Sequence, residues 1–313
     1  MINKKTKAIV LLSGGLDSML AVKILQSQGI EVTGLSFQSY FFNCEQAKKA
    51  ARALGIKLII KDFSIEHLKM VKSPKYGYGK TMNPCLDCHA LMFKQVKTII
   101  KKQGFDFVAT GEVLGQRPMS QNKKALEIIE KESGLLGCLV RPLSAKLLKK
   151  TIPEEKGMVI REQLLDISGR SRKKQIALAK KWKIKEYPTP AGGCILTDSE
   201  FSLRLKDLFK IFPLCQKNDI ELLGVGRHFW QDKNKVIIGR NEQENLKIKA
   251  LAKKRDVLIE LQDYSGPLTL VRSYGNNKQE QKALLKAKKL TQYYSLKARN
   301  KKQVKFNIKL VGA

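Results

Sequence analysis

Six residues near the N-terminus have the types and spacing of a phosphate-binding turn. The segment Ser13-Gly-Gly-Leu-Asp-Ser18 follows an apolar run and precedes a helical pattern. The N–H groups of a helix N-terminus attract anions, and Gly14 and Gly15 let a phosphate approach the backbone closely. Ser13 and Ser18 add hydroxyl donors, whereas Asp17 suits such a site if a Mg²⁺ ion bridges it to the phosphates. The alternative is an ordinary tight turn.

Three cysteines form a second set of residues that could do chemistry. Cys85 and Cys88 make a C-x-x-C pair that opens a predicted helix, and a helix N-terminus favours the thiolate form. Cys194 follows the small-residue stretch 190–193, whose glycines would let a thiol approach another group closely. The C-x-x-C pair alone is compatible with a redox pair, half of a zinc site or two buried thiols.

An alternation of short strands and helices must position these residues. An apolar strand over 8–12, a helical pattern over 19–25 and a strand over 30–37 make a βαβ unit. Such a unit implies a right-handed crossover and a parallel sheet, and two further strands are predicted over 56–60 and 105–111. The fold class is therefore predicted as α/β, a doubly wound and mostly parallel sheet.

The carboxyl ends of the parallel strands are the predicted ligand edge of this sheet. Phe37 and Gly111 fall at such ends, so Phe37 is a candidate to flank an adenine, with core packing as its alternative. A loop is predicted through residues 69–74, and alternating apolar and basic residues predict a helix over 88–102.

Composition predicts a polyanionic partner. The chain has 313 residues, and 60 Lys and Arg against 28 Asp and Glu give a net charge of +32. Nucleic acid is the leading candidate, and an anionic membrane surface is the competitor. We expect a catalytic domain over 1–200 and a basic α+β module over 201–313, whose tail from Asn277 interleaves lysines with Tyr293 and Tyr294.

The N-terminus predicts a cytoplasmic protein. The apolar run after Lys7 is too short for an export signal and ends in Gly-Gly-Leu-Asp rather than a cleavage site. No apolar stretch approaches the ~18 residues of a transmembrane helix. In the cytoplasm the six cysteines are expected to be thiols, metal ligands or nucleophiles rather than structural disulfides.

These motifs together resemble the PP-loop ATP pyrophosphatases, and within them the tRNA thiolases of the MnmA and ThiI types. Ser13 to Ser18 resembles their S-G-G-x-D-S signature, and Asn83-Pro84 through Cys88 resembles an N-P-x-x-x-C segment. The stretch 191–194 is similar to their second-cysteine segment, and Ala109-Thr-Gly111 to their A-T-G loop. Glu112 stands where a His is usual, and Cys85 where many members have an Asp.

The resemblance implies a sulfur-transfer site built on cysteines. Cys85, Cys88 and Cys194 would ligate a 4Fe–4S cluster with one open iron, since thiolates are its usual ligands. In the rival interpretation Cys88 and Cys194 are a nucleophile pair, one carrying a persulfide and the other closing a disulfide. A zinc or purely structural role is the third alternative.

The implied function is ATP-dependent thiolation of a tRNA uridine. The turn at Ser13–Ser18, with Phe37 and Gly111, would bind ATP, and Asp17 would bind Mg²⁺. The carbonyl oxygen would be adenylylated and then replaced by sulfur from sulfide or a persulfide-carrying protein. The alternatives are a PP-loop amidotransferase or ligase acting on tRNA, similar to lysidine synthetase, and a non-catalytic RNA-binding protein with a vestigial nucleotide fold. The modified ring position and the oligomeric state stay open.

Overall fold

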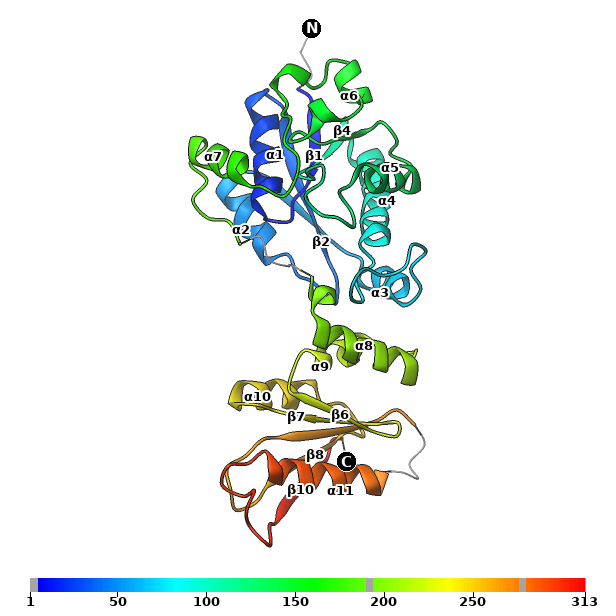
Figure 1. The fold of residues 1–313 in the computed structure, drawn as a ribbon, viewed down its shortest axis with the longest axis vertical. Helices are drawn as coiled ribbons and strands as arrows, with labels where there is room; N and C mark the ends of the chain where they lie inside the picture. The colour runs from blue at the N-terminus through cyan, green and yellow to red at the C-terminus, as the bar shows by residue number, and fades with distance from the viewer. Residues whose placement is uncertain (1–4, 190–193, 276–279, 313) are drawn as a thin grey trace. The chain divides into compact units, whose positions relative to one another are not determined.

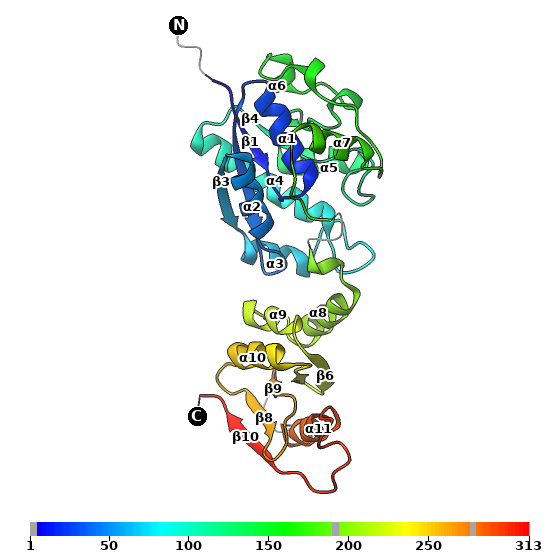
Figure 2. The ribbon, with the colours of Figure 1, turned by 90° about the vertical axis from the view of Figure 1, so that its left-hand side faces the viewer.

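The computed structural model describes residues 5–189, 194–275 and 280–312. The chain divides into two compact units, Met1–Thr197 and Asp198–Ala313. Each unit contains a β-sheet with helices packed against it (Figures 1 and 2). We describe the two units separately.

The described part of the N-terminal unit is organised around a five-stranded parallel sheet of order β3-β2-β1-β4-β5. Ala8 of β1 lies opposite both Val32 of β2 and Phe107 of β4, so β1 is central. The run of β-branched and apolar residues in β1 suits a strand that is buried on both faces. The strands are β1 (Lys7–Leu11), β2 (Glu31–Gln38), β3 (Lys57–Asp62), β4 (Phe107–Thr110) and β5 (Leu139–Val140).

Helices cover both faces of this sheet, which makes it doubly wound (Figure 1). Ala8 and Val10 point into a core shared with α1, α2 and α7, whereas Ile9 and Val108 point into a core shared with α4 and α5. The helices are α1 (Leu16–Ser27), α2 (Glu45–Leu54), α3 (Ser64–Lys72), α4 (Cys85–Gln103), α5 (Lys123–Ser133), α6 (Ile152–Glu155) and α7 (Lys173–Lys181). Three short 3₁₀ turns lie at Ala145–Leu147, Arg161–Gln163 and Ile195–Thr197.

The predicted fold class is confirmed, but one predicted loop is wrong. Residues 69–72 belong to helix α3, which buries His67, Leu68 and Val71 on one face. The apolar residues of this helix alternate with lysines, and the Ser-Pro pair that follows it marks the end of the helix rather than a loop centre. Helix α5 is a further element for which the sequence analysis made no prediction.

The described part of the C-terminal unit contains an antiparallel five-stranded sheet of order β10-β8-β9-β7-β6. One face packs against α9 and α10 through Ile237 and Leu270, and the other packs against α11 through Val236 and Val271 (Figure 2). Its strands are β6 (Arg227–Gln231), β7 (Asn234–Ile238), β8 (Val257–Leu261), β9 (Thr269–Ser273) and β10 (Phe306–Leu310). Its helices are α8 (Ser199–Ile211), α9 (Lys217–Leu223), α10 (Glu242–Leu251) and α11 (Glu280–Tyr293).

A buried ion-pair network fastens the first of these faces. The side chain of Arg272 on β9 is 1% exposed, and its guanidinium contacts Asp219 at 2.9 Å and Asp256 at 2.6 Å.

The predicted basic tail forms regular secondary structure. Beyond 277–279, which lie outside the described residues, it forms α11 and the edge strand β10. Alanines Ala283 and Ala287 let α11 lie close against the sheet.

Candidate active site

The turn between β1 and α1 has a conformation that requires glycine at its first position. Gly14 has a φ of 81°, in the left-handed region that favours glycine. A Cβ atom built on Gly14 would lie 2.3 Å from the backbone carbon of Gln46 at the start of α2. Helix α2 therefore packs directly against the turn, and any side chain at Gly14 would separate them.

The two serines of the motif shape this turn with their hydroxyl groups. Ser18 Oγ donates to the carbonyl oxygen of Gly15 at 2.8 Å, and Ser13 Oγ accepts from the N–H of Gly15 at 3.2 Å. The side chain of Ser13 is exposed, whereas Ser18 is buried. The turn thus presents Ser13 outwards at the N-terminus of α1, where backbone N–H groups lack carbonyl partners within the helix.

The two carboxylate oxygens of Asp17 differ in whether a described residue donates a hydrogen bond to them. Gln116 Nε2 donates to Asp17 Oδ2 at 2.8 Å, and Gln175 Nε2 in turn contacts Gln116 Oε1 at 3.4 Å. Asp17 Oδ1 is buried and has no hydrogen-bond partner among the described residues. A buried acceptor without a partner is costly, and a Mg²⁺ ion with its water ligands would satisfy it. The residues present therefore fit the ion that the sequence predicted, and Gln116 is a positioning residue that the sequence analysis missed.

Gly111 approaches the same turn from the end of β4. A Cβ atom at Gly111 would lie 2.4 Å from the backbone nitrogen of Ser18 and 2.5 Å from the backbone carbon of Asp17. Glycine is required at position 111 because a side chain there would collide with the backbone of Asp17 and Ser18. The structure thus brings Gly111 together with the motif at Ser13–Ser18, as a packing residue.

Phe37 is not part of this group. Its ring is 5% exposed and packs in the core shared with α4, with its centroid 5.0 Å from that of Phe63. The side chain points to the face of the sheet opposite the core that contains α1. We therefore correct the predicted adenine contact: Phe37 is a core residue, because strand alternation directs it away from the turn.

The predicted cysteines lie in the same unit and influence one another. Cys85 is the first residue of α4 and Cys88 lies one turn further on. Asn83 Nδ2 contacts Cys85 Sγ at 3.2 Å. Cys194 adjoins residues 190–193, whose predicted glycine contribution lies outside the described residues.

Burial, rather than the helix dipole, controls the thiol of Cys88. Burial raises the pKa of Cys88 well above its ordinary value, and the neighbouring Cys194, Cys85 and Asp87 raise it further. Burial also raises the pKa of Cys194 to about 11; Cys85 adds to this effect, whereas Arg117 opposes it. Burial therefore opposes the thiolate form that the helix N-terminus was expected to favour.

The three thiols do not form a metal-binding group as they stand. The described residues contain no group of three or more His, Cys, Asp or Glu side chains placed to hold a metal ion. Thiolate chemistry suits an iron–sulfur cluster, and Cys85, Cys88 and Cys194 are the thiols that would hold it.

A buried charge network lies next to the thiol helix. Glu112 is 4% exposed, and its carboxylate accepts from Arg141 Nε at 3.0 Å and contacts His89 Nδ1 at 2.9 Å. Burial raises the pKa of Glu112, but Arg141 and His89 outweigh it, so the pKa lies below its ordinary value. Arg141 also pairs with Glu130. The sequence analysis noted Glu112 as a departure but missed Arg141 and the network.

The loop that follows β4 contacts both the turn and the thiol helix. Gly111 and Gln116 touch the motif around Asp17, as described above. Glu112 contacts His89, the neighbour of Cys88 on α4, and the charge of Arg117 acts on the thiol of Cys194. One short segment of chain therefore contacts the turn at Ser13–Ser18 and the helix that carries Cys85 and Cys88.

Comparisons with known proteins agree with this arrangement. Residues 6–133 match the family described as tRNA methyl transferase HUP domain, and residues 226–312 match the NFACT protein RNA binding domain. Residues 6–133 of the N-terminal unit are therefore similar to a HUP domain. This confirms the resemblance inferred from Ser13–Ser18.

Curated relatives carry the name tRNA-specific 2-thiouridylase MnmA. The protein of Treponema denticola is 38% identical over 120 residues, which cover 34% of this chain and 32% of that protein. The protein of Sulfurimonas denitrificans is 36% identical over 118 residues, covering 34% of this chain and 35% of that protein. The chain thus spans about a third of the length of the curated relatives it matches. A solved 4-thiouridine synthetase–RNA complex with bound ATP aligns with a TM-score of 0.34 and 19% identity, covering 57% of this chain and 52% of that chain.

The HUP match covers the turn, the C-x-x-C pair and the loop after β4, and it ends before Cys194. Cys194 is related to the site by its electrostatic effect on the pKa of Cys88 and by the sequence motif. Across the described part of the chain, no helix is both long enough and apolar enough to cross a membrane.

Proposed function

We propose that this protein thiolates a uridine of tRNA at the expense of ATP. The observation that carries the proposal is the loop after β4. It contacts the turn around Asp17, it contacts His89 beside Cys88, and the charge of its Arg117 acts on Cys194. Activation by a nucleotide and delivery of sulfur can then take place within one unit. The names of the relatives and the match to an RNA-binding domain support tRNA as the substrate.

In the activation step, the turn binds the phosphates of ATP. The N–H groups of Gly14 and Gly15, with the hydroxyl groups of Ser13 and Ser18, would hold the pyrophosphate. Asp17 would hold Mg²⁺, which neutralises phosphate charge when bound, and Gln116 keeps its carboxylate oriented. Attack of the uridine carbonyl oxygen on the α-phosphorus would then release pyrophosphate and leave AMP on that oxygen.

In the sulfur step, we propose that Cys88 and Cys194 act as a pair. A donor protein that carries a persulfide transfers its outer sulfur to one of these thiols, and the donor cysteine leaves as a thiolate. The terminal sulfur of the new persulfide then attacks the activated carbon, so that AMP leaves. The second thiol attacks the sulfur of the first, which breaks the persulfide bond and leaves sulfur on the base. The resulting disulfide must be reduced by a cellular thiol.

The finer alternative is a 4Fe–4S cluster on Cys85, Cys88 and Cys194. Three thiol donors support it. Anaerobic purification with iron and sulfide analysis separates the two. Iron-free protein that thiolates tRNA would exclude the cluster, and loss of activity when iron is removed would exclude the simple pair.

The function is tested by incubating the full chain with tRNA, ATP, Mg²⁺ and a persulfide donor. We expect thiouridine by mass spectrometry together with pyrophosphate release. Asp17→Asn should abolish both, whereas Cys194→Ser should abolish thiouridine alone. Cys138→Ser is the matched control, because this thiol lies in the core shared with α4.

The remaining alternatives predict different results in the same assay. Pyrophosphate release by the wild-type chain without thiouridine, unchanged in Cys85→Ala and Cys194→Ser, would favour a PP-loop ligase, which has no need of these thiols. Failure of the wild-type chain to release pyrophosphate with tRNA present would favour a vestigial nucleotide fold. A cytoplasmic location remains a prediction from the N-terminal sequence.

A further inference from the structure

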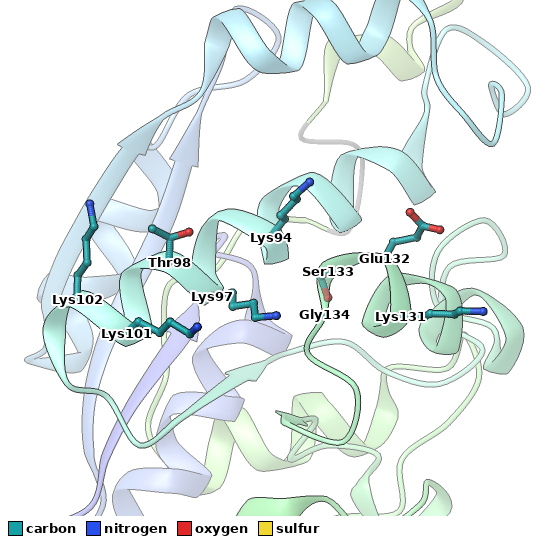
Figure 3. A pocket seen from close by; sticks show the side chains of 9 residues that line it. All are labelled: Lys94, Lys97, Thr98, Lys101, Lys102, Lys131, Glu132, Ser133 and Gly134. Carbon is teal, nitrogen blue, oxygen red and sulfur yellow. The ribbon is translucent and has the colours of Figure 1, made fainter.

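A groove lined by lysines lies between α4 and the end of α5. It is separated along α4 from the thiols of Cys85 and Cys88. We call it the α4–α5 lysine groove; it has a volume of about 550 Å³ and includes Glu132 as its one acidic side chain (Figure 3). Lys97 extends towards Gly134, where a Cβ atom would lie 2.6 Å from its ammonium group. Its five lysines are Lys94, Lys97, Lys101, Lys102 and Lys131.

The positive charge of the groove is not neutralised by the protein. The carboxylate of Glu132 already pairs with Lys75 Nζ and accepts a hydrogen bond from Tyr76 Oη, both at 2.7 Å. Within 5–189, 194–275 and 280–312, none of the five groove lysines forms an ion pair. The groove therefore concentrates positive charge around a hollow, which is the electrostatic form of an anion site.

Helix stability explains only part of this charge. Lys101, Lys102 and Lys131 lie in the last turns of their helices, where positive charge interacts favourably with the helix dipole. Lys94 and Lys97 lie in the middle of α4, where this explanation does not apply. With Lys101 they follow a spacing of three and four residues, so like charges face one another, which destabilises a helix. A polyanionic ligand would offset the repulsion between these lysines.

The groove belongs to the helix whose first turn carries the thiols. At 1.5 Å rise per residue, Lys94 lies about 9 Å and Lys101 about 20 Å along α4 from Cys88. A nucleic acid with a base at Cys88 therefore has backbone phosphates close enough to reach the groove. A single phosphate would occupy only part of a groove of this length.

We propose that the α4–α5 lysine groove binds the phosphodiester backbone of the tRNA, as a site separate from the RNA-binding domain match. This assignment rests on the proposed function, and it identifies where the catalytic unit itself contacts its substrate. Phosphate contacts of this kind position a nucleic acid without reading its sequence. The groove would thus set the register of the tRNA relative to Cys88.

The test compares two triple variants of the full chain in tRNA filter binding over a range of salt concentrations. The groove variant is Lys94→Gln with Lys97→Gln and Lys101→Gln; the control is Lys49→Gln with Lys57→Gln and Lys156→Gln, three exposed lysines outside the groove. We expect the groove variant to lose about tenfold in affinity and its log–log salt slope to fall by about two to three. Equal losses in both variants would overturn the groove assignment, because net charge alone would explain them.

A second measurement does not depend on substitution. Lysines of the wild-type chain are labelled with an amine-reactive reagent with and without tRNA, and labelling is read by mass spectrometry. Protection of Lys94, Lys97 and Lys101 by tRNA, with Lys49 unprotected, supports the site. Protection by inorganic phosphate at millimolar concentration but not by tRNA would overturn it in favour of a small-anion site.

The two proposals fail in different ways. If the groove lysines are unprotected while wild-type protein still forms thiouridine, the groove assignment falls and the proposed function stands. If tRNA protects the groove but no thiouridine forms under any sulfur supply, the site stands and the reaction is a different one on tRNA.

Discussion

At the residue scale, His67 is a buried titratable group that lies among aromatic rings. It is fully buried against Phe63, whose ring centroid lies 4.8 Å away in a stacked geometry, and against Phe41 and Phe42. Neither ring nitrogen has a hydrogen-bond partner among the described residues. Burial lowers the pKa of His67 from 6.5 to about 4. The histidine is therefore neutral when the protein is folded at neutral pH.

This pKa shift predicts an acid-sensitive N-terminal unit. The unfolded chain binds the proton more readily, so stability present above pH 6.5 is lost progressively as the pH falls towards 4. Between about pH 7 and about pH 5, the unfolding free energy of His67→Phe should decrease by about 2 kcal/mol less than that of the wild type. Urea unfolding of both proteins at the two pH values measures this. An equal decrease in wild type and variant would contradict the burial of an uncharged ring.

The motif around Asp17 could be predicted from the sequence more readily than the residues that contact it in the fold. Ser13 to Ser18 could be found because a turn, its glycines and its acidic residue lie within six consecutive positions. Gln116 and Arg141 could not, because they reach Asp17 and Glu112 only after β4 and β5 pair with the sheet. The acidic residue at Glu112, unusual for the resembled family, was the one available signal that a basic partner must be nearby.

At the element scale, strands were predicted more reliably than helices with mixed composition. The β-branched runs of β1 and β2 are buried on both faces and leave a clear signal. Helix α3 was read as a loop because its apolar positions are interrupted by Lys69 and Lys72, which face solvent. The lysine spacing in α4 was visible in the sequence, but its meaning required the end of α5 beside it.

An element-scale prediction concerns the end of α11 in the C-terminal unit. Tyr293 is 62% exposed and meets Tyr294 edge to face, with ring centroids 5.1 Å apart. Arg227 covers the ring of Tyr294 at 4.5 Å, and Arg299 lies 5.9 Å from the ring of Tyr293. Stacked cations and rings of this kind suit unpaired bases. Tyr293→Ala should therefore weaken binding of single-stranded RNA by about tenfold.

The control for this prediction is Leu296→Ala, which removes a side chain that is 84% exposed and carries no ring. Fluorescence anisotropy with a labelled single-stranded oligonucleotide gives both affinities. Equal affinities for Tyr293→Ala and Leu296→Ala would show that the exposed ring does not stack on a base. Tyr294 is a poorer test, because Arg227 already covers its ring and its loss would also affect folding.

At the scale of the whole molecule, two units with different chemistry share one large positive charge. The net charge of +32 predicts a polyanionic partner, and a match to an RNA-binding domain covers residues 226–312. The nucleotide turn and the thiols all lie in the unit that ends at Thr197. The proposed function thus places the chemistry in the first unit and much of the RNA affinity in the second.

This division predicts the behaviour of a fragment that ends at Thr197. The fragment retains the sheet β3-β2-β1-β4-β5 with both of its cores, so it should fold and bind ATP as the full chain does. Its tRNA affinity at about 0.15 M salt should fall at least about tenfold, and its salt slope should be smaller, because fewer phosphates are neutralised. Circular dichroism and ATP binding serve as controls for folding, and filter binding measures the affinity. A folded fragment that binds tRNA as tightly as the full chain would show that the N-terminal unit alone provides the RNA-binding surface.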